Sequence, residues 1–335
     1  MEPMTESSEP SLGLGARKLH VASRPPSAKP TVSVLLCAYS SARWPLLCEA
    51  IASVRAQTRL PEEVLLVVDH NPDLLARARA EFRDVRCLEN QAARGLSGAR
   101  NTGVQHATGD VVAFLDDDAR ANPDWLAAIV AEYADPGVVG TGGPVDPDWS
   151  AARPRWFPRE FEWVVGCSYR GSPTSTRAIR NPIGANMSFR REAFGAGGFN
   201  ADLGRIGRTP LGCEETEFAI RAQAETGGTI LHVAGARVEH LVTPERATWR
   251  YFYSRCWAEG LSKASVALVA GSYDALSSER AYVARVLPGG VARGLGEAAR
   301  GDASGILRSS AIVVGLALTA AGYAWGRAGA RLRRR

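Results

Sequence analysis

The sequence contains no closely spaced pair of cysteines. Its six cysteines are scattered along 335 residues without a CxxC pair: Cys37, Cys48, Cys87, Cys167, Cys213 and Cys256. This spacing argues against a zinc site and against a dense disulfide framework, and it favours a reducing compartment. Residues 1–30 lack an apolar run and are rich in Ser, Pro, Gly and charge, so no signal peptide is visible and we expect a flexible leader.

A strong net charge is also absent. The formal charge of +5 is mild for this length, and apolar residues at 45% with charged residues at 22% are typical of a folded protein. The arginines gather at the end of the chain, where residues 327–335 contain five of them. A basic tail beside an apolar stretch suits an anionic membrane surface at least as readily as nucleic acid, so we expect contact with a membrane surface and no nucleic-acid partner.

The first half of the chain alternates buried strands with amphipathic helices. The strand patterns are TVSVLLCAY (31–39), EEVLLVVD (62–69) and DVVAFLDDD (110–118). This alternation predicts an α/β fold whose parallel strands are joined by right-handed crossovers. Because ligands bind beyond the carboxyl ends of such strands, Tyr39, Asp69 and the run Asp116 to Asp118 should meet at one edge.

The second half is less regular. Residues 143–183 predict a long ordered loop that carries Trp149, Trp156 and Trp163, which either stack on a sugar or form a hydrophobic loop core. A strand (184–194), a helix (212–228), a strand (229–241) and a longer helix from Pro244 follow. These patterns divide a domain at 31–265 into a nucleotide-binding half (31–140) and an acceptor and catalytic half (141–265).

Residues 266–335 predict a helical C-terminal region. Its segment 311–326 is sixteen residues without a charge, and it is followed by the basic tail. A membrane span needs roughly 20 apolar residues, with a lower limit of about 17, so this segment lies at the threshold. A single span and a peripheral or buried helix are equally compatible with the sequence.

Three adjacent carboxylates end the third strand. Asp116, Asp117 and Asp118 repel one another unless a cation neutralises them, and oxygen ligands of this kind suit Mg²⁺ or Mn²⁺ bridged to substrate phosphates. A solvated acidic turn is the alternative. The preceding VVAFL places the run at the carboxyl edge of the sheet, which favours the metal-diphosphate interpretation.

Other polar residues have two interpretations from the sequence alone. Asp69 either accepts a hydrogen bond from a base or ribose, or caps the next turn. Glu214 and Glu215 either stabilise a helix N-terminus or include a general base. His240 is either structural or a ligand, and Arg255 either meets a phosphate or solvates a helix.

Five blocks in order carry a family resemblance. They are VSVLLCAYS, SVRAQTRLPEEVLLVVD, GLSGARNTGVQHATGDVVAFLDDDA, GANMSFRREAFGAGGF and GCEETEFAIR. Over about residues 31–260, the chain resembles the family-2 glycosyltransferases with a GT-A fold, which are inverting and use nucleotide sugars. The resemblance implies a Rossmann-like, mostly parallel sheet flanked by helices, and an enzyme of cell-envelope polysaccharide biosynthesis.

The resemblance also implies roles for individual residues. Tyr39, Asp69 and Arg100 match positions near the nucleotide, with Asp69 placed to meet the base. Asp116 and Asp118 match the ends of the DxD motif, so that Asp116 faces the ribose or sugar and Asp118 holds the metal. Asp117 belongs to the same donor-binding run, Gly184 to Asn186 would lie beside the donor sugar, and His240 would complete the metal site. Glu214 and Glu215 match the acidic pair whose second member is the expected base.

Two positions depart from the family pattern. Glu215 stands where aspartate is usual, which leaves Glu214 as an alternative base, and His70 follows Asp69 where a second acidic residue is usual. The implied reaction moves a sugar to a hydroxyl of a lipid-linked or polysaccharide acceptor at the cytoplasmic membrane face. The rivals are a sugar-phosphate nucleotidyltransferase, whose glycine-rich loop is missing from CAYSSARWP, and an inactive binding subunit, against which the retained carboxylates argue.

Overall fold

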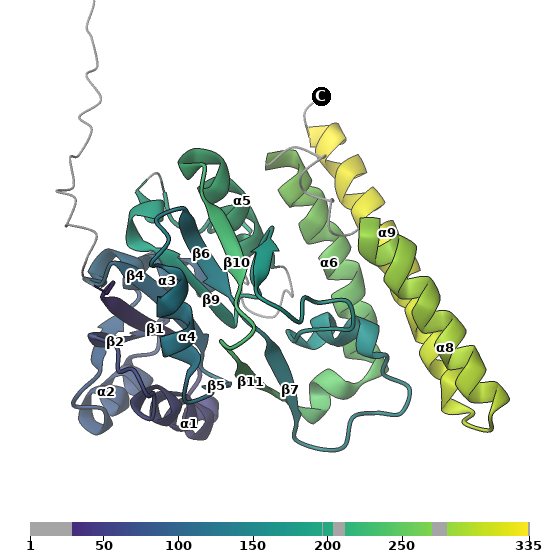
Figure 1. Ribbon diagram of the computed structural model, residues 1–335, viewed down its shortest axis with the longest axis horizontal. Coiled ribbons are helices and arrows are strands. Elements are labelled where there is room, and N and C mark those ends of the chain that lie inside the picture. Colours follow the sequence, from purple (N-terminus) through teal and green to yellow (C-terminus); the bar gives the residue numbers. More distant parts are fainter. Residues whose placement is uncertain (1–28, 196, 204–211, 270–279, 334–335) are drawn as a thin grey trace, which may run out of the picture.

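The computed structural model describes residues 29–195, 197–203, 212–269 and 280–333 (Figure 1). The expected flexible leader, 1–30, therefore lies almost wholly outside the described residues. The expected boundary at residue 265 falls inside a helix, α6 (Trp249–Val269).

One eight-stranded sheet forms the centre of the domain, in the order β3-β2-β1-β4-β9-β6-β10-β8. Its first four strands are all parallel: β1 Val32–Ala38, β2 Glu63–Val68, β3 Arg86–Glu89 and β4 Val111–Asp116. The hydrophobic runs of β1, β2 and β4 are buried on both faces, as expected of strands that helices cover on either side. The predicted parallel arrangement is confirmed, with β3 as an additional edge strand.

The other half of the sheet mixes directions. Its strands are β6 Val138–Gly142, β8 Arg177–Ile179, β9 Asn186–Arg190 and β10 Thr229–His232. Strand β9 runs antiparallel to both neighbours, β4 and β6, whereas β10 is parallel to β6. The sheet therefore reverses direction between β4 and β9, next to the carboxylate run.

Helices cover the sheet (Figure 1). They are α1 Trp44–Arg55, α2 Pro72–Glu81, α3 Leu96–His106, α4 Trp125–Glu132 and α5 Glu214–Thr226, with short turns η1 Ser41–Arg43 and η3 Arg191–Phe194. Two of these helices begin at residues suited to a first turn. Pro45 lies in the first turn of α1, and the Asn71 side chain caps α2 by accepting from Leu74 N at 3.1 Å.

A second, three-stranded sheet lies beside the first. It joins β5 Ala119–Ala121, β11 Val238–Val242 and β7 Val145–Trp149. The single strand expected at 229–241 is therefore wrong: Ala236 N bonds Val233 O in a turn, and the chain passes from one sheet to the other. Because β11 pairs with β5, His240 lies opposite Ala119, next in sequence to Asp118.

The expected loop at 143–183 contains regular structure. It includes β7, β8 and the 3₁₀ helix η2 Arg159–Val165. Trp156 stacks on Trp249 with ring centroids 3.7 Å apart, and Trp149 packs edge-on against Phe157. Two of the three tryptophans therefore form a hydrophobic core beneath the loop, whereas Trp163 lines a cavity.

In the described part of the C-terminal region there are three long helices, α6, α8 and α9. The turn η4 Pro244–Ala247 leads into α6, and the π-helical segment η6 Tyr282–Val286 leads into α8 Leu287–Ala299 and α9 Ser304–Arg333. Helix α9 packs closely on α6, because a Cβ at Gly322 would lie 2.4 Å from Trp257 O. Among the described residues, Ser304–Ala330 is the one stretch long and apolar enough to cross a membrane by length and composition.

Candidate functional site

A cavity of about 1500 Å³ opens at the carboxyl ends of β1, β2 and β4. The site residues expected from the sequence that line it are Tyr39, Asp69, Arg100, Asp116, Asp117, Asp118, Glu214, Glu215 and His240. The cavity continues past them to α6, η6 and α9, where Tyr282, Leu316 and Tyr323 form its wall. Topology thus gathers side chains that are up to about two hundred residues apart in the sequence into one space.

Two carboxylates and one imidazole meet at the centre of this cavity. One ligand atom from each of Asp116, Asp118 and His240 lies within 4.8 Å of the others. His240 Nε2 is 3.3 Å from Asp118 Oδ1, while its Nδ1 lies 3.8 Å from Cys167 Sγ. Two carboxylate oxygens and a nitrogen suit Mn²⁺ or Mg²⁺, so the residues present fit a divalent cation.

Cationic side chains that the sequence analysis did not single out neutralise the carboxylate run. Arg43 pairs with Asp117 at 3.0 Å and also with Asp118, and Arg246 Nη2 lies 3.4 Å from Asp118 Oδ2. Arg43 follows β1 by five residues and Arg246 follows β11 by four. The sequence indicates these two arginines only through their positions, just after strands that end at the cavity.

The members of the run differ in environment. Asp116 keeps 30% of its side chain exposed, whereas Asp117 and Asp118 are buried. Burial raises the pKa of Asp117 to about 7, although Arg43 opposes this shift. Burial also acts to raise the pKa of Asp118, but His240 and Arg43 together outweigh it and hold that pKa below its usual value. Asp118 is therefore the more firmly ionised of the two buried carboxyls.

Asp69 is held by its own surroundings. Its Oδ2 accepts from Gly95 N at 3.0 Å, and its Oδ1 accepts from Asn90 Nδ2 at 2.6 Å and contacts His70 Nδ1 at 2.8 Å. Gly95 has φ 126°, in the region that favours glycine, just before α3. Tyr39 is 60% exposed at the rim, with the Arg43 guanidinium 5.8 Å from its ring centroid.

Arg100 is buried between the candidate metal cluster and helix α5. Its Nη1 donates to Glu214 Oε1 at 3.0 Å, and its Nη2 contacts Gly184 O at 3.0 Å and Asp116 Oδ1 at 3.4 Å. Arg100, expected near the nucleotide, lines the cavity, and both of its terminal nitrogens have protein partners. It links Asp116 to the acidic pair.

The two glutamates of the acidic pair have different surroundings. Glu214 is buried against Arg100, whereas Glu215 is half-buried and faces the cavity beside Gly184. Burial, followed by the charge of Glu214, raises the pKa of Glu215 to about 8. Cys213, with φ 76°, sits in the left-handed region immediately before α5, at the turn from which both glutamates project. Glu215 is the carboxyl of the pair that is open to a bound substrate.

Asn186 does not join the site. Its side chain is fully buried; its Nδ2 donates to Pro144 O and Ala236 O, and its Oδ1 accepts from Trp125 Nε1 at 2.8 Å. Gly184 and Ala185 line the cavity, but Asn186 does not. The segment expected beside the donor sugar therefore borders the cavity through Gly184 and Ala185, whereas β9 turns the Asn186 amide toward the interior, where it joins three segments.

Known proteins resemble this chain in sequence and fold. A model of glycosyl transferase family 2 matches residues 33–198. A glucosyl-dolichyl phosphate glucuronosyltransferase of Haloferax volcanii is 38% identical over 237 residues, covering 69% of this chain and 76% of that protein. The succinoglycan biosynthesis protein ExoM of Rhizobium meliloti is 28% identical over 244 residues, covering 68% of this chain and 72% of that protein.

Solved structures share the fold. A mannosyltransferase from Pyrobaculum calidifontis, in complex with GDP-Man and Mn²⁺, superposes with a TM-score of 0.59 at 23% identity and covers 90% of this chain and 88% of its own. The GT-A architecture expected from the sequence is confirmed, with the sheet flanked by helices and an apolar helix at the C-terminal end.

Proposed function

Because the chain belongs to glycosyl transferase family 2, we propose that it moves a sugar from a nucleoside-diphosphate donor to an acceptor hydroxyl, with inversion at the anomeric carbon. One observation carries the proposal: the Asp116, Asp118 and His240 cluster and the carboxyl of Glu215 line the same cavity. This family membership disfavours both a nucleotidyltransferase and an inactive subunit.

The donor half of the cavity supports recognition of a nucleotide. Asp69, fixed by Gly95 and Asn90, can accept from a base N–H, and Tyr39 at the rim offers a ring for the base. Asp116, Asp118 and His240 would hold Mg²⁺ or Mn²⁺, which offsets charge on the departing diphosphate. Arg43 and Arg246, beside that cluster, can meet the phosphate oxygens.

Glu215 is the proposed general base. It takes the proton of the acceptor hydroxyl, the hydroxyl oxygen bonds to the anomeric carbon, and the bond from that carbon to the diphosphate oxygen breaks. Glu214 stays ion-paired to Arg100. Arg100 in turn contacts Asp116, so the pair helps to position the Asp116 carboxylate. This division of roles follows from exposure, since Glu215 faces the cavity and Glu214 is buried.

The acceptor we propose is a lipid-linked or growing saccharide at the cytoplasmic membrane face. Support comes from the relative named for a dolichyl phosphate substrate and from the apolar stretch Ser304–Ala330. The six cysteines, none of them bridged, agree with a reducing compartment.

The test is a panel of nucleotide sugars with and without Mn²⁺ or Mg²⁺. A cognate donor binds the native state and should raise the melting temperature only when metal is present. Release of nucleoside diphosphate with an acceptor then identifies the reaction. A panel in which no nucleotide sugar binds, with or without metal, contradicts the proposal.

A further inference from the structure

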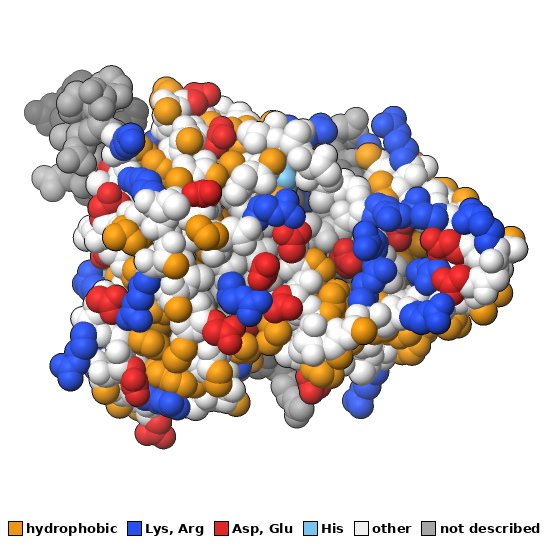
Figure 2. All heavy atoms as spheres, turned by 60° about the horizontal axis from the view of Figure 1, so that its bottom comes forward, with side chains coloured by type: hydrophobic (Ala, Val, Ile, Leu, Met, Phe, Trp, Pro, Cys, Tyr) orange, Lys and Arg blue, Asp and Glu red, His pale blue; other side chains and the backbone are white. Residues whose placement is uncertain are grey.

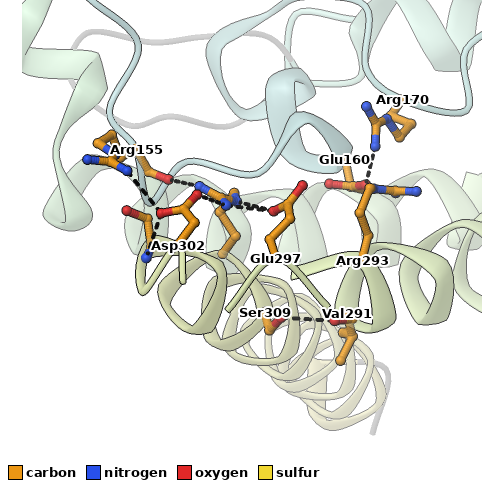
Figure 3. Close-up of polar contacts among 10 residues, drawn as sticks. Arg155, Glu160, Arg170, Val291, Arg293, Glu297, Asp302 and Ser309 are labelled. Carbon is orange, nitrogen blue, oxygen red and sulfur yellow. Dashed lines mark hydrogen bonds and ion pairs between the residues drawn. The ribbon is translucent and has the colours of Figure 1, made fainter. Parts of the chain in front are cut away.

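The hairpin of α8 and α9 directs a network of paired charged side chains toward the catalytic domain. Arg308 pairs with Glu297 at 2.6 Å and with Asp302 at 2.7 Å. Figure 3 shows these two carboxylates within the network. Further pairs join the hairpin to the 153–170 segment: Arg155 with Asp302, and Arg293 with Glu160, which also meets Arg170. The ion pairs fasten the hairpin and occupy its domain-facing side.

The outward side of α9 carries no charge between residues 306 and 325. Exposed positions recur with the spacing of a single helix face and include Ile306, Leu307, Val313, Val314, Ala321 and Trp325. Trp325 is 69% exposed, and 33% of the apolar window is buried within the protein. From Ile306 to Trp325, at 1.5 Å per residue, this face is about 29 Å long. The hairpin thus has paired charges on its domain-facing side and apolar side chains on its outer side. A helix on a water-exposed protein surface has the opposite arrangement.

Helix α8 extends the same surface. Its exposed Pro288, Ala292, Leu295 and Ala299 lie on one helix face. Arg300 and Arg327 lie near opposite ends of the hairpin surface, and neither has an ion-pair partner among the residues the structure describes. Figure 2 shows basic and acidic side chains intermixed on the side of the molecule formed by these helices, with hydrophobic side chains along its outer edge.

The packing of α9 decides how such a surface meets a bilayer. Close contacts run along α6, where a Cβ on Gly260 would lie 2.2 Å from Thr319 O. If α9 crossed a bilayer in this arrangement, α6 would carry Arg255, Glu259 and Lys263, which line the catalytic cavity, into hydrocarbon. Lying in the membrane plane keeps those charges in water and buries the apolar face.

The same helix forms a wall of the catalytic cavity. Leu316, Thr319 and Tyr323 line the cavity from the inner face of α9, while Val313, Val314 and Trp325 face outward. One helix therefore separates the site of transfer from the apolar outer surface. A bilayer in contact with that surface would lie next to the α9 end of the cavity, away from the run Asp116 to Asp118.

We infer that the α8–α9 hairpin is an in-plane docking surface for an anionic bilayer. Its apolar face enters the headgroup region, and Arg300 and Arg327 meet lipid phosphates at the two ends. This inference rests on the proposed transfer to a lipid-linked acceptor. Docking would hold the cavity beside the membrane that contains this acceptor. The occupant of the surface is the lipid bilayer.

Vesicle binding of the full chain tests this inference. Binding should be strong to vesicles containing phosphatidylglycerol and weak to phosphatidylcholine alone, and tryptophan emission should shift to the blue on binding. Trp325→Phe should remove most of that shift, since the other seven tryptophans are more buried. The double variant Val313→Asp with Val314→Asp should lower binding by more than about tenfold. Leu60→Asp, at a 62% exposed leucine in the donor half, is the matched control and should bind as the native chain does.

The basic residues are tested separately. Arg300→Gln and Arg327→Gln should each weaken binding to anionic vesicles about fivefold, whereas Arg83→Gln, on the turn after α2, should not. Native binding by the aspartate double variant overturns the inference. Resistance to alkaline carbonate extraction indicates a span, and a vesicle-free dimer that the same variant dissociates indicates a second copy as occupant; either result overturns it.

Failure of docking and failure of glycosyl transfer give different results. Release of nucleoside diphosphate with a water-soluble acceptor, measured without vesicles, should stay native in all of these surface variants. Loss of vesicle binding with that activity intact supports the docking surface. A chain that binds vesicles but shows no transfer with any donor contradicts the proposed function and leaves the docking surface standing.

Discussion

The guanidinium of Arg100 lies 3.0 Å from the carboxylate of Glu214, in a buried position. The same side chain reaches Asp116 at 3.4 Å. Arg100 therefore connects the run Asp116 to Asp118 with the acidic pair at the start of α5. This contact distinguishes two adjacent glutamates. Glu214 has a buried protein partner, whereas Glu215 faces the cavity, as its proposed role as general base requires.

Replacing Arg100 should destabilise the protein. Arg100→Met leaves Glu214 buried without its counter-ion, which costs about 3–5 kcal/mol of unfolding free energy. Chemical denaturation measures this loss, and the double variant Arg100→Met with Glu214→Gln should recover part of it. A stability change within about 0.5 kcal/mol for Arg100→Met contradicts the buried pairing.

The activity should depend on the ionisation of Glu215. A general base acts when deprotonated, and the pKa of Glu215 is raised to about 8 by burial and by Glu214. Below that pH, kcat/KM should fall about tenfold per unit, and above it kcat/KM should level off. Glu214→Gln removes the neighbouring charge and should move this limb to lower pH. A pH profile that is flat from 6 to 9 contradicts the assignment.

Divalent metal should be required through Asp118 and His240. Chelation should stop transfer, and Mn²⁺ or Mg²⁺ should restore it. Asp118→Asn and His240→Gln should each raise the metal concentration needed for half-maximal activity by at least about tenfold. The control is Asp146→Asn, at a carboxylate paired with Arg237 on the outer surface, which should leave the metal requirement unchanged. Full activity of the native chain in excess chelator contradicts the metal site.

Asn186 should matter for stability and not for donor affinity. Asn186→Leu leaves the carbonyls of Pro144 and Ala236 without their donor, at a cost of about 2 kcal/mol or more. Denaturant titration gives the stability, and donor KM of the folded protein should stay within about twofold of native. A stable variant with a greatly raised donor KM would instead place Asn186 at the donor sugar, beside which the family resemblance puts it.

The edge of the sheet where β1, β2 and β4 end could be predicted, because local sequence determines these strands. Long apolar runs specify β1, β2 and β4, and parallel topology then brings Asp69 and Asp116 together. Strand β3 was not expected because it is a short edge strand with few buried side chains. The split of 229–241 also escaped prediction, since the chain changes sheets at a turn that hydrophobicity does not mark.

Side-chain partnerships were less predictable than positions. Arg43 and Arg246 reach the carboxylate run only because β1 and β11 end beside it, and their spacing in the sequence shows no relation to Asp118. Asn186 lies next to cavity-lining residues in sequence, but the alternation of β9 turns its side chain inward. The choice between Glu214 and Glu215 likewise depends on a distant arginine.

Glu215→Gln tests the central proposal most directly, measured against Glu214→Gln in the same assay. Donor binding with metal should stay near native in Glu215→Gln, while transfer should fall by at least about a thousandfold, because the amide cannot accept the acceptor's proton. Glu214→Gln should retain more transfer than Glu215→Gln. It removes the ion-pair partner of Arg100 but keeps the proposed general base. Near-native transfer by Glu215→Gln, with intact donor binding, would contradict the account.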